Sequence, residues 1–264
     1  MNLGHPEKGF RGGLMVAPLY CLVFLYFAFP VSVALANTAM VLAVLLALGQ
    51  LVDARARAGL VQALRNPVVA PALMLAAVMV LATLWSPADW EQIGDYLRKY
   101  FKLLLLPVFI YLLASPKVRR YCWQAFAAAM LFTLASTWLN VWIDPPWSST
   151  HNQGFGVDHT VFKDHISQGI MMSLFTALCV HWANKATSNW KKILCWLVAG
   201  LAAASILVLT QSRTGYLSLL LATFTGWYVG RRSAVNPEKQ LFRLLLVAML
   251  VARAAFVAVY FEHY

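Results

Sequence analysis

The chain has 264 residues, of which 61% are hydrophobic and 12% charged, and it carries ten tryptophans. This composition excludes an ordinary soluble globular domain and is typical of a polytopic membrane protein. The net charge of +11 does not indicate a nucleic-acid partner, because the basic residues fall in short clusters between apolar runs, where they act as topology signals.

The apolar runs predict an all-α protein, a transmembrane bundle of about nine membrane-spanning helices. In chain order they are Leu14–Phe29, Val31–Val52, Pro67–Trp85, Phe101–Ala114, Tyr121–Ile143, His165–Trp182, Ile193–Thr210, Tyr216–Gly230 and Leu241–Tyr260. Pro30 separates the first two runs with almost no loop, so they form either a tight helical hairpin or one kinked span. Residues 1–264 are interpreted as a single integral membrane domain.

The distribution of lysine and arginine predicts the orientation of the chain. If the N-terminus is cytoplasmic and every run crosses, most of these cations lie inside. Only five lie outside: Arg98, Lys99, Lys102, Lys163 and Arg213. This positive-inside bias favours the hairpin, because merging the first two runs would invert every later loop. Residues 144–164 then form a periplasmic loop, the longest polar stretch of the chain.

The first three outside cations, Arg98, Lys99 and Lys102, follow an acidic and aromatic stretch. Apolar residues recur at helical spacing through it, at Trp90, Ile93, Leu97 and Phe101. We therefore expect this segment to lie in the plane of the interface before the chain enters the membrane. The alternative is that the cations merely reach out to lipid phosphates.

The periplasmic loop predicts irregular structure and ends in Lys163, Asp164 and His165, at the start of the next helix. Asp164 suits a helix N-cap, whereas Lys163 and His165 either serve the helix start or face a polar cavity shared with Arg213. The histidines lack helical ligand spacing and nearby carboxylates, and the four cysteines have no paired spacing. We therefore expect no metal and no other cofactor.

Arg213 lies in the polar segment Gln211-Ser212-Arg213-Thr214-Gly215-Tyr216, between two apolar runs. Its planar guanidinium matches phosphate oxygens, and Gly215 permits close approach by a ligand or by another helix. The alternative is an arginine that snorkels at a helix end. The segment is, however, more polar than such an anchor requires.

Three clusters together resemble the bacterial O-antigen ligase family, which is itself similar to O-antigen polymerases and protein O-oligosaccharyltransferases. They are Arg98-Lys99-Tyr100-Phe101-Lys102, Phe162-Lys163-Asp164-His165 and Ser212-Arg213-Thr214-Gly215. The resemblance implies a GT-C-like glycosyltransferase of lipopolysaccharide biosynthesis in the bacterial inner membrane. Such an enzyme moves polysaccharide from undecaprenyl pyrophosphate to the lipid A core at the periplasmic face, without a metal.

The resemblance also implies roles for the outside residues. The pyrophosphate would be bound by Arg213, together with Arg98, Lys99 and Lys102, which would stabilise the charge of the leaving group. The cavity would be lined by Lys163, Asp164, His165, Ser212 and Thr214. Beyond the lipid-linked glycan and the lipid A-core acceptor, the expected partners are membrane lipids.

The chain departs from the family in one respect. Members usually continue into a large periplasmic loop with a histidine proposed as the base for the acceptor hydroxyl. We therefore expect this sequence to be the N-terminal portion of a longer ligase or a shorter relative, and to be inactive as a ligase by itself. His165 is the best remaining candidate for a base.

A transporter or flippase for lipid-linked substrates is the alternative from another class. It is less favoured because transporters usually carry ionisable residues near mid-membrane, where only Arg253, in the last run, is a candidate, and because no internal repeat is visible. Sugar, acceptor and oligomeric state are not determined by the sequence.

Overall fold

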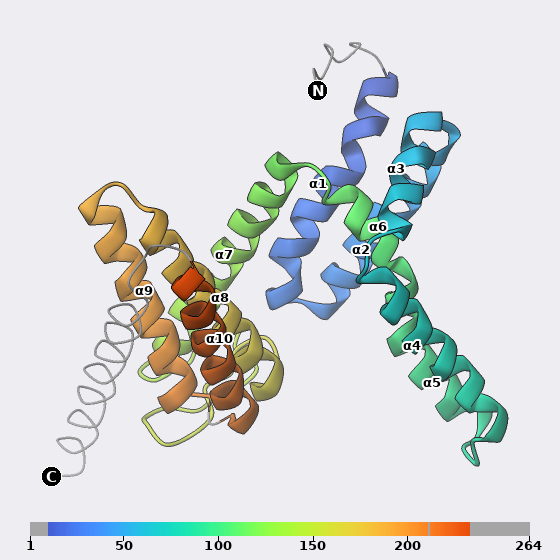
Figure 1. Ribbon diagram of the computed structural model, residues 1–264. Helices are drawn as coiled ribbons and strands as arrows, with labels where there is room; N and C mark the ends of the chain where they lie inside the picture. Colours follow the sequence, from blue (N-terminus) through green and yellow to red (C-terminus); the bar gives the residue numbers. More distant parts are fainter. Residues whose placement is uncertain (1–9, 211, 233–264) are drawn as a thin grey trace, which may run out of the picture. The chain divides into compact units, whose positions relative to one another are not determined.

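The computed structural model describes residues 10–210 and 212–232 (Figure 1). These residues contain helices and irregular segments but no strand, which confirms the predicted all-α class. The α-helices are α1 Phe10–Val31, α2 Val33–Gly49, α3 Ala54–Leu64, α4 Val69–Ala82, α5 Trp90–Tyr100, α6 Leu106–Leu112, α7 Pro116–Leu139, α8 His165–Lys185, α9 Asn189–Val208 and α10 Arg213–Arg232. Three short 3-10 segments accompany them: η1 Gln50–Val52, η2 Thr83–Trp85 and η3 Phe101–Leu105.

Four of the described helices are long and apolar enough to cross a membrane: Val33–Val52, Pro116–Leu139, His165–Lys185 and Asn189–Val208. The bent pair of α3 and α4 would raise the number to five if it forms one span. A helix satisfies its own backbone hydrogen bonds, which is what hydrocarbon demands of a crossing segment. The structure thus supports a membrane protein with four or five such helices, and the larger predicted number stays a prediction. The predicted run Leu241–Tyr260 lies outside the described residues.

The chain is divided into two compact units, which are described separately. The first holds α1 up to Tyr26 and the chain from Ala34 to Ala125, and the second holds Phe27–Val33 and the described residues from Phe126 onward. Helix α7 therefore begins in one unit and ends in the other.

The first unit is built on the predicted hairpin of α1 and α2. Leu22 of α1 and Ala43 of α2 are both fully buried in one apolar cluster, and they lie nearly equally far along the chain on either side of Ser32. A single kinked span would hold these residues apart, so the hairpin interpretation is confirmed. The cluster also takes in Val108 and Leu112 of α6.

One of the predicted runs is preceded by a sharp bend, and another begins as a 3-10 segment. Run Pro67–Trp85 corresponds to α4 and η2, and α4 is preceded by α3, from which it is bent by 78°. Asp53 starts α3 by accepting a hydrogen bond from Arg55 N at 3.0 Å, a normal N-cap. Run Phe101–Ala114 corresponds to η3 followed by the seven-residue helix α6.

The second unit centres on α8, which packs against both α9 and α10 (Figure 1). The chain reverses in the short connections 186–188 and 209–212, so α8 and α10 run in the same direction. The N-terminal ends of both helices therefore lie at the same end of this unit. Buried small residues on α9, including Ala199 and Ala203, allow the helices to approach closely.

Candidate functional site

Helices α8 and α10 touch through their glycines. A methyl group on Gly169 would lie 3.0 Å from Gly215 Cα and 3.3 Å from Ser212 Oγ, so neither glycine leaves room for a larger side chain. Ser173 reinforces the contact, because its hydroxyl lies 2.8 Å from Gly169 O and 3.3 Å from Gly215 O. The close approach expected at Gly215 is confirmed, and its partner is another helix.

The N-terminus of α10 is capped by Ser212. The fully buried Ser212 hydroxyl accepts a hydrogen bond from Gly215 N at 3.1 Å and lies 2.9 Å from Thr214 Oγ1. Arg213 is the first residue of the helix and its side chain is exposed. No side chain among the described residues pairs with its guanidinium. The predicted residues Ser212, Arg213 and Thr214 thus form one helix start.

The N-terminus of α8 is capped by Asp164, as predicted. The Asp164 carboxylate accepts from Ser167 N and Ser167 Oγ, both at 2.9 Å. These two hydrogen bonds lower the pKa of Asp164. The Lys163 side chain lies over Phe29, with its ammonium 5.3 Å from the centre of the ring. His165, in the first turn of α8, is exposed.

The two helix starts differ electrostatically. A helix N-terminus carries a partial positive charge, which a carboxylate neutralises and a hydroxyl does not. Asp164 compensates the end of α8, whereas the neutral Ser212 leaves the end of α10 uncompensated. Arg213 adds a full positive charge to it. An anion would therefore be held better at α10 than at α8.

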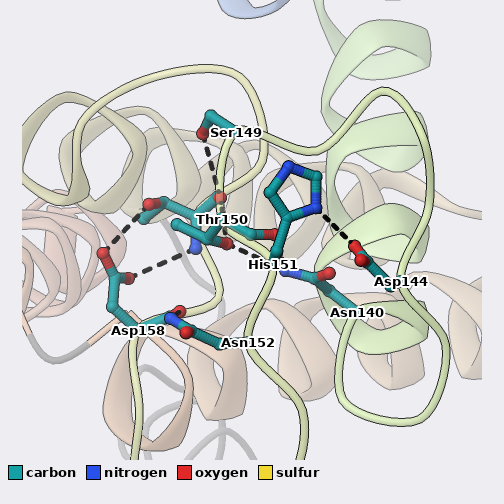
Figure 2. Close-up of polar contacts among 8 residues, drawn as sticks. Asn140, Asp144, Ser149, Thr150, His151, Asn152 and Asp158 are labelled. Atoms are coloured by element: carbon teal, nitrogen blue, oxygen red, sulfur yellow. Dashed lines mark hydrogen bonds and ion pairs between the residues drawn. The ribbon is translucent and has the colours of Figure 1, made fainter.

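The loop before α8 is irregular, as predicted, but it is extensively hydrogen-bonded (Figure 2). Its two arms pair: Ser149 N donates to Val161 O at 2.8 Å, and Thr150 Oγ1 donates to Thr160 O at 2.7 Å. The buried Asn140, just after α7, donates from Nδ2 to Thr150 Oγ1 at 2.9 Å. Such a network orders the loop without regular secondary structure.

Further hydrogen bonds tie this loop to the helices of the second unit. His159 N donates to Leu209 O at 2.9 Å, at the end of α9 in the short connection that leads to α10. Gln168 of α8 accepts from Val161 N and donates to Thr137 Oγ1 of α7, both at 3.0 Å. The loop thus covers the end of the unit where α8 and α10 begin.

One aspartate–histidine pair in the loop is arranged so that the histidine could accept a proton. His151 Nδ1 lies 2.7 Å from Asp144 Oδ1 (Figure 2). The side chain of His151 is 63% exposed and that of Asp144 43%. An ionised carboxylate can only accept, so Nδ1 carries the proton and Nε2 is available to take another. His159 differs, because its ring is buried and its Nε2 donates to Gly154 O at 2.6 Å.

Some of the predicted site residues lie together in the second unit, and the others belong to the first unit. Lys163, Asp164, His165, Ser212, Arg213 and Thr214 all lie at the same end of the second unit. Arg98 and Lys102 belong to the first unit, on α5 and η3. The side chain of Lys99 lies outside what the structure describes.

The Asp144–His151 pair was not singled out from the sequence. The two residues lie seven positions apart in an irregular loop, where no helical or strand period predicts which side chains meet. The only signal was the presence of a carboxylate and an imidazole in one predicted periplasmic loop.

Comparison with known proteins identifies no relative. No family model matches the chain, and no curated protein or solved structure is significantly similar to it.

Proposed function

We propose that this chain is an O-antigen ligase-like glycosyltransferase of the bacterial inner membrane, multi-pass and GT-C-like, with a cytoplasmic N-terminus. It transfers polysaccharide from undecaprenyl pyrophosphate to the lipid A core in lipopolysaccharide biosynthesis. The observation that carries the proposal is Arg213 at the exposed start of α10, beside the neutral Ser212 cap. Backbone N–H groups and a guanidinium at one point suit a pyrophosphate.

Arg213 would act on the leaving group. As the acceptor oxygen bonds to the anomeric carbon, the bond from that carbon to the pyrophosphate oxygen breaks, and the pyrophosphate leaves with the electron pair. Positive charge fixed in advance where this negative charge develops lowers the barrier. Lys163 and His165, at the same end of the unit, would add to the positive potential. That Arg98, Lys99 and Lys102, which belong to the first unit, also contact the pyrophosphate stays a prediction from the sequence.

His151 would take the proton of the acceptor hydroxyl. Nε2 accepts the proton, and Asp144 stabilises the resulting imidazolium through Nδ1–H. His151 is favoured over His165 because the carboxylate orients its ring. The sequence-based expectation that the chain is inactive by itself stays a prediction, and transfer activity of residues 1–264 would contradict it.

Binding in lipid nanodiscs tests the anion site without requiring turnover. The wild-type chain should bind undecaprenyl pyrophosphate, and Arg213→Ala should weaken binding by roughly 10-fold or more, since hydrogen bonds to charged groups contribute about 1.5–3 kcal/mol. Arg213→Lys keeps the charge but loses the paired N–H donors of the guanidinium, so its affinity should lie between those of the wild type and Arg213→Ala. Arg120→Ala, which removes an exposed arginine at the start of α7, is the matched control.

Three results would contradict parts of the proposal. Equal binding by wild type and Arg213→Ala would remove Arg213 from the site. Binding followed by movement of the lipid-linked glycan across the bilayer without transfer would instead identify a flippase. Transfer to a protein or to a second glycan, and not to the lipid A core, would identify an oligosaccharyltransferase or a polymerase.

A further inference from the structure

We propose that the turn formed by residues 145–147, at the start of the loop after α7, is a lipid anchor. It lies back along α7 and places the Trp147 ring among the lipids that surround this end of the helix, where head groups meet acyl chains. The partner is the bilayer itself. The inference concerns the second unit alone, and it depends neither on the proposed enzymatic function nor on the direction in which the chain crosses.

The turn lies beside α7 and not beyond its end. Trp147 Nε1 donates to Ser136 Oγ at 3.2 Å, and the Trp147 ring centre lies 6.2 Å from that of Phe132. Helix α7 ends at Leu139, so Ser136 precedes its end by three residues and Phe132 by seven. At 1.5 Å per residue, the ring of Trp147 thus reaches back about 5–10 Å along the helix.

The part of α7 that Trp147 contacts lies within the length of a membrane crossing. Helix α7 is long and apolar enough to span, and after Arg120 no Asp, Glu, Lys or Arg follows until Asp144. Ser136 comes 16 residues after Arg120. This corresponds to a rise of about 24 Å, whereas the hydrocarbon core is roughly 30 Å thick. A helix with Arg120 at one surface therefore keeps Ser136 inside the far edge of the core, and a tilt brings it deeper.

The outward side of the turn continues the lipid-facing side of α7. Phe132, Ala135 and Leu139 are exposed at intervals of three and four residues, which is one face of a helix. Trp147 is still 48% exposed although it packs against Phe132. A continuous apolar surface of this kind is not favoured in water. The lipid that covers this face of α7 therefore also meets the ring of Trp147.

The turn carries few polar groups that lipid would leave unpaired. Pro145 and Pro146 have no backbone N–H, and Pro145 O accepts from Ser148 N at 3.0 Å. The indole N–H of Trp147 is bonded to Ser136. Unpaired donors and acceptors are costly in hydrocarbon, so these features suit a turn at the membrane boundary, the level at which tryptophan is enriched.

Fluorescence quenching tests the anchor in the full chain reconstituted in nanodiscs. The emission of the wild type minus that of Trp147→Phe gives the contribution of Trp147, and phenylalanine keeps an aromatic ring against Phe132. We expect this contribution to lose most of its intensity in lipids brominated close to the glycerol and less in lipids brominated near the chain ends. It should not respond to iodide in the water.

Gln153→Trp is the control, because it places an indole at an exposed position of the same loop. The added emission should be quenched by iodide and not by brominated lipids. A second measurement does not rely on the folding of Trp147→Phe. A photoreactive benzoylphenylalanine at position 147 should attach the chain to phospholipid on irradiation, and the same group at position 153 should not.

Three outcomes would overturn the inference. Quenching of the Trp147 contribution by iodide alone would place the turn in water. Protection from both iodide and brominated lipids, with no lipid attached at position 147, would show that protein covers the ring. Strongest quenching by bromines at the chain ends would place the ring deep in the bilayer, away from the head groups.

Discussion

Replacing Gly169 by alanine should separate α8 from α10. The new methyl group would meet Gly215 Cα at 3.0 Å, and a backbone atom cannot move aside as a flexible side chain can. Overpacking of this kind costs about 1–3 kcal/mol, and alanine regains about 1 kcal/mol over glycine in a helix. We therefore expect a net loss of up to about 2 kcal/mol.

Gly94→Ala is the matched control, because it makes the same change within helix α5 where nothing lies within 4 Å of the added methyl. It should stabilise by up to about 1 kcal/mol through helix propensity alone. The difference in unfolding free energy between the two variants isolates the cost of placing a methyl group in the α8–α10 contact. We expect the two substitutions to act in opposite directions.

Thermal unfolding in detergent, followed with a thiol-reactive dye, measures both effects. The buried Cys179 reports the second unit and the buried Cys122 the first, each as the single remaining thiol. Gly169→Ala should also weaken pyrophosphate binding, because the methyl would lie 3.3 Å from the Ser212 hydroxyl that caps α10. If Gly169→Ala raised the unfolding temperature as much as Gly94→Ala does, the helix contact and its link to the cap would be refuted.

Three further predictions concern the loop and the cap of α8. Gln153→Cys should react with a membrane-impermeant maleimide in intact cells and Lys117→Cys only after the inner membrane is breached; the reverse pattern would invert the topology. Asp164→Ala should cost about 1 kcal/mol of unfolding free energy. Because the pKa of Asp164 is lowered from 3.8, its contribution is present above that pH and is lost as the pH falls through the lower folded value; an unchanged acid-unfolding curve for Asp164→Ala would contradict this. In a form of the protein that carries out transfer, whether residues 1–264 or a longer chain, His151→Gln and Asp144→Asn should reduce transfer by about 10²–10⁴ while binding is retained, and undiminished transfer would exclude the pair as the base.

Local features were predictable from the sequence because they depend on few neighbours. Long apolar runs predict α2, α8 and α9, since only a helix satisfies every backbone group in lipid. Asp164 was predicted as a cap because an N-cap bonds to residues two or three positions further on. The apolar spacing in residues 90–101 likewise predicted the amphipathic helix α5.

The sequence by itself determined that the chain is helical, that several of its helices are apolar enough to cross a membrane, and where most of them lie. It also showed which polar clusters stand out between the apolar runs. Only the tertiary structure decided which of these features meet. Gly215 could have faced a ligand or a helix, and packing selected Gly169; Asp144 and His151 meet because hydrogen bonds from other segments order their loop. Apolar periodicity sets what one segment buries, but contacts between segments depend on the direction in which each connection turns the chain.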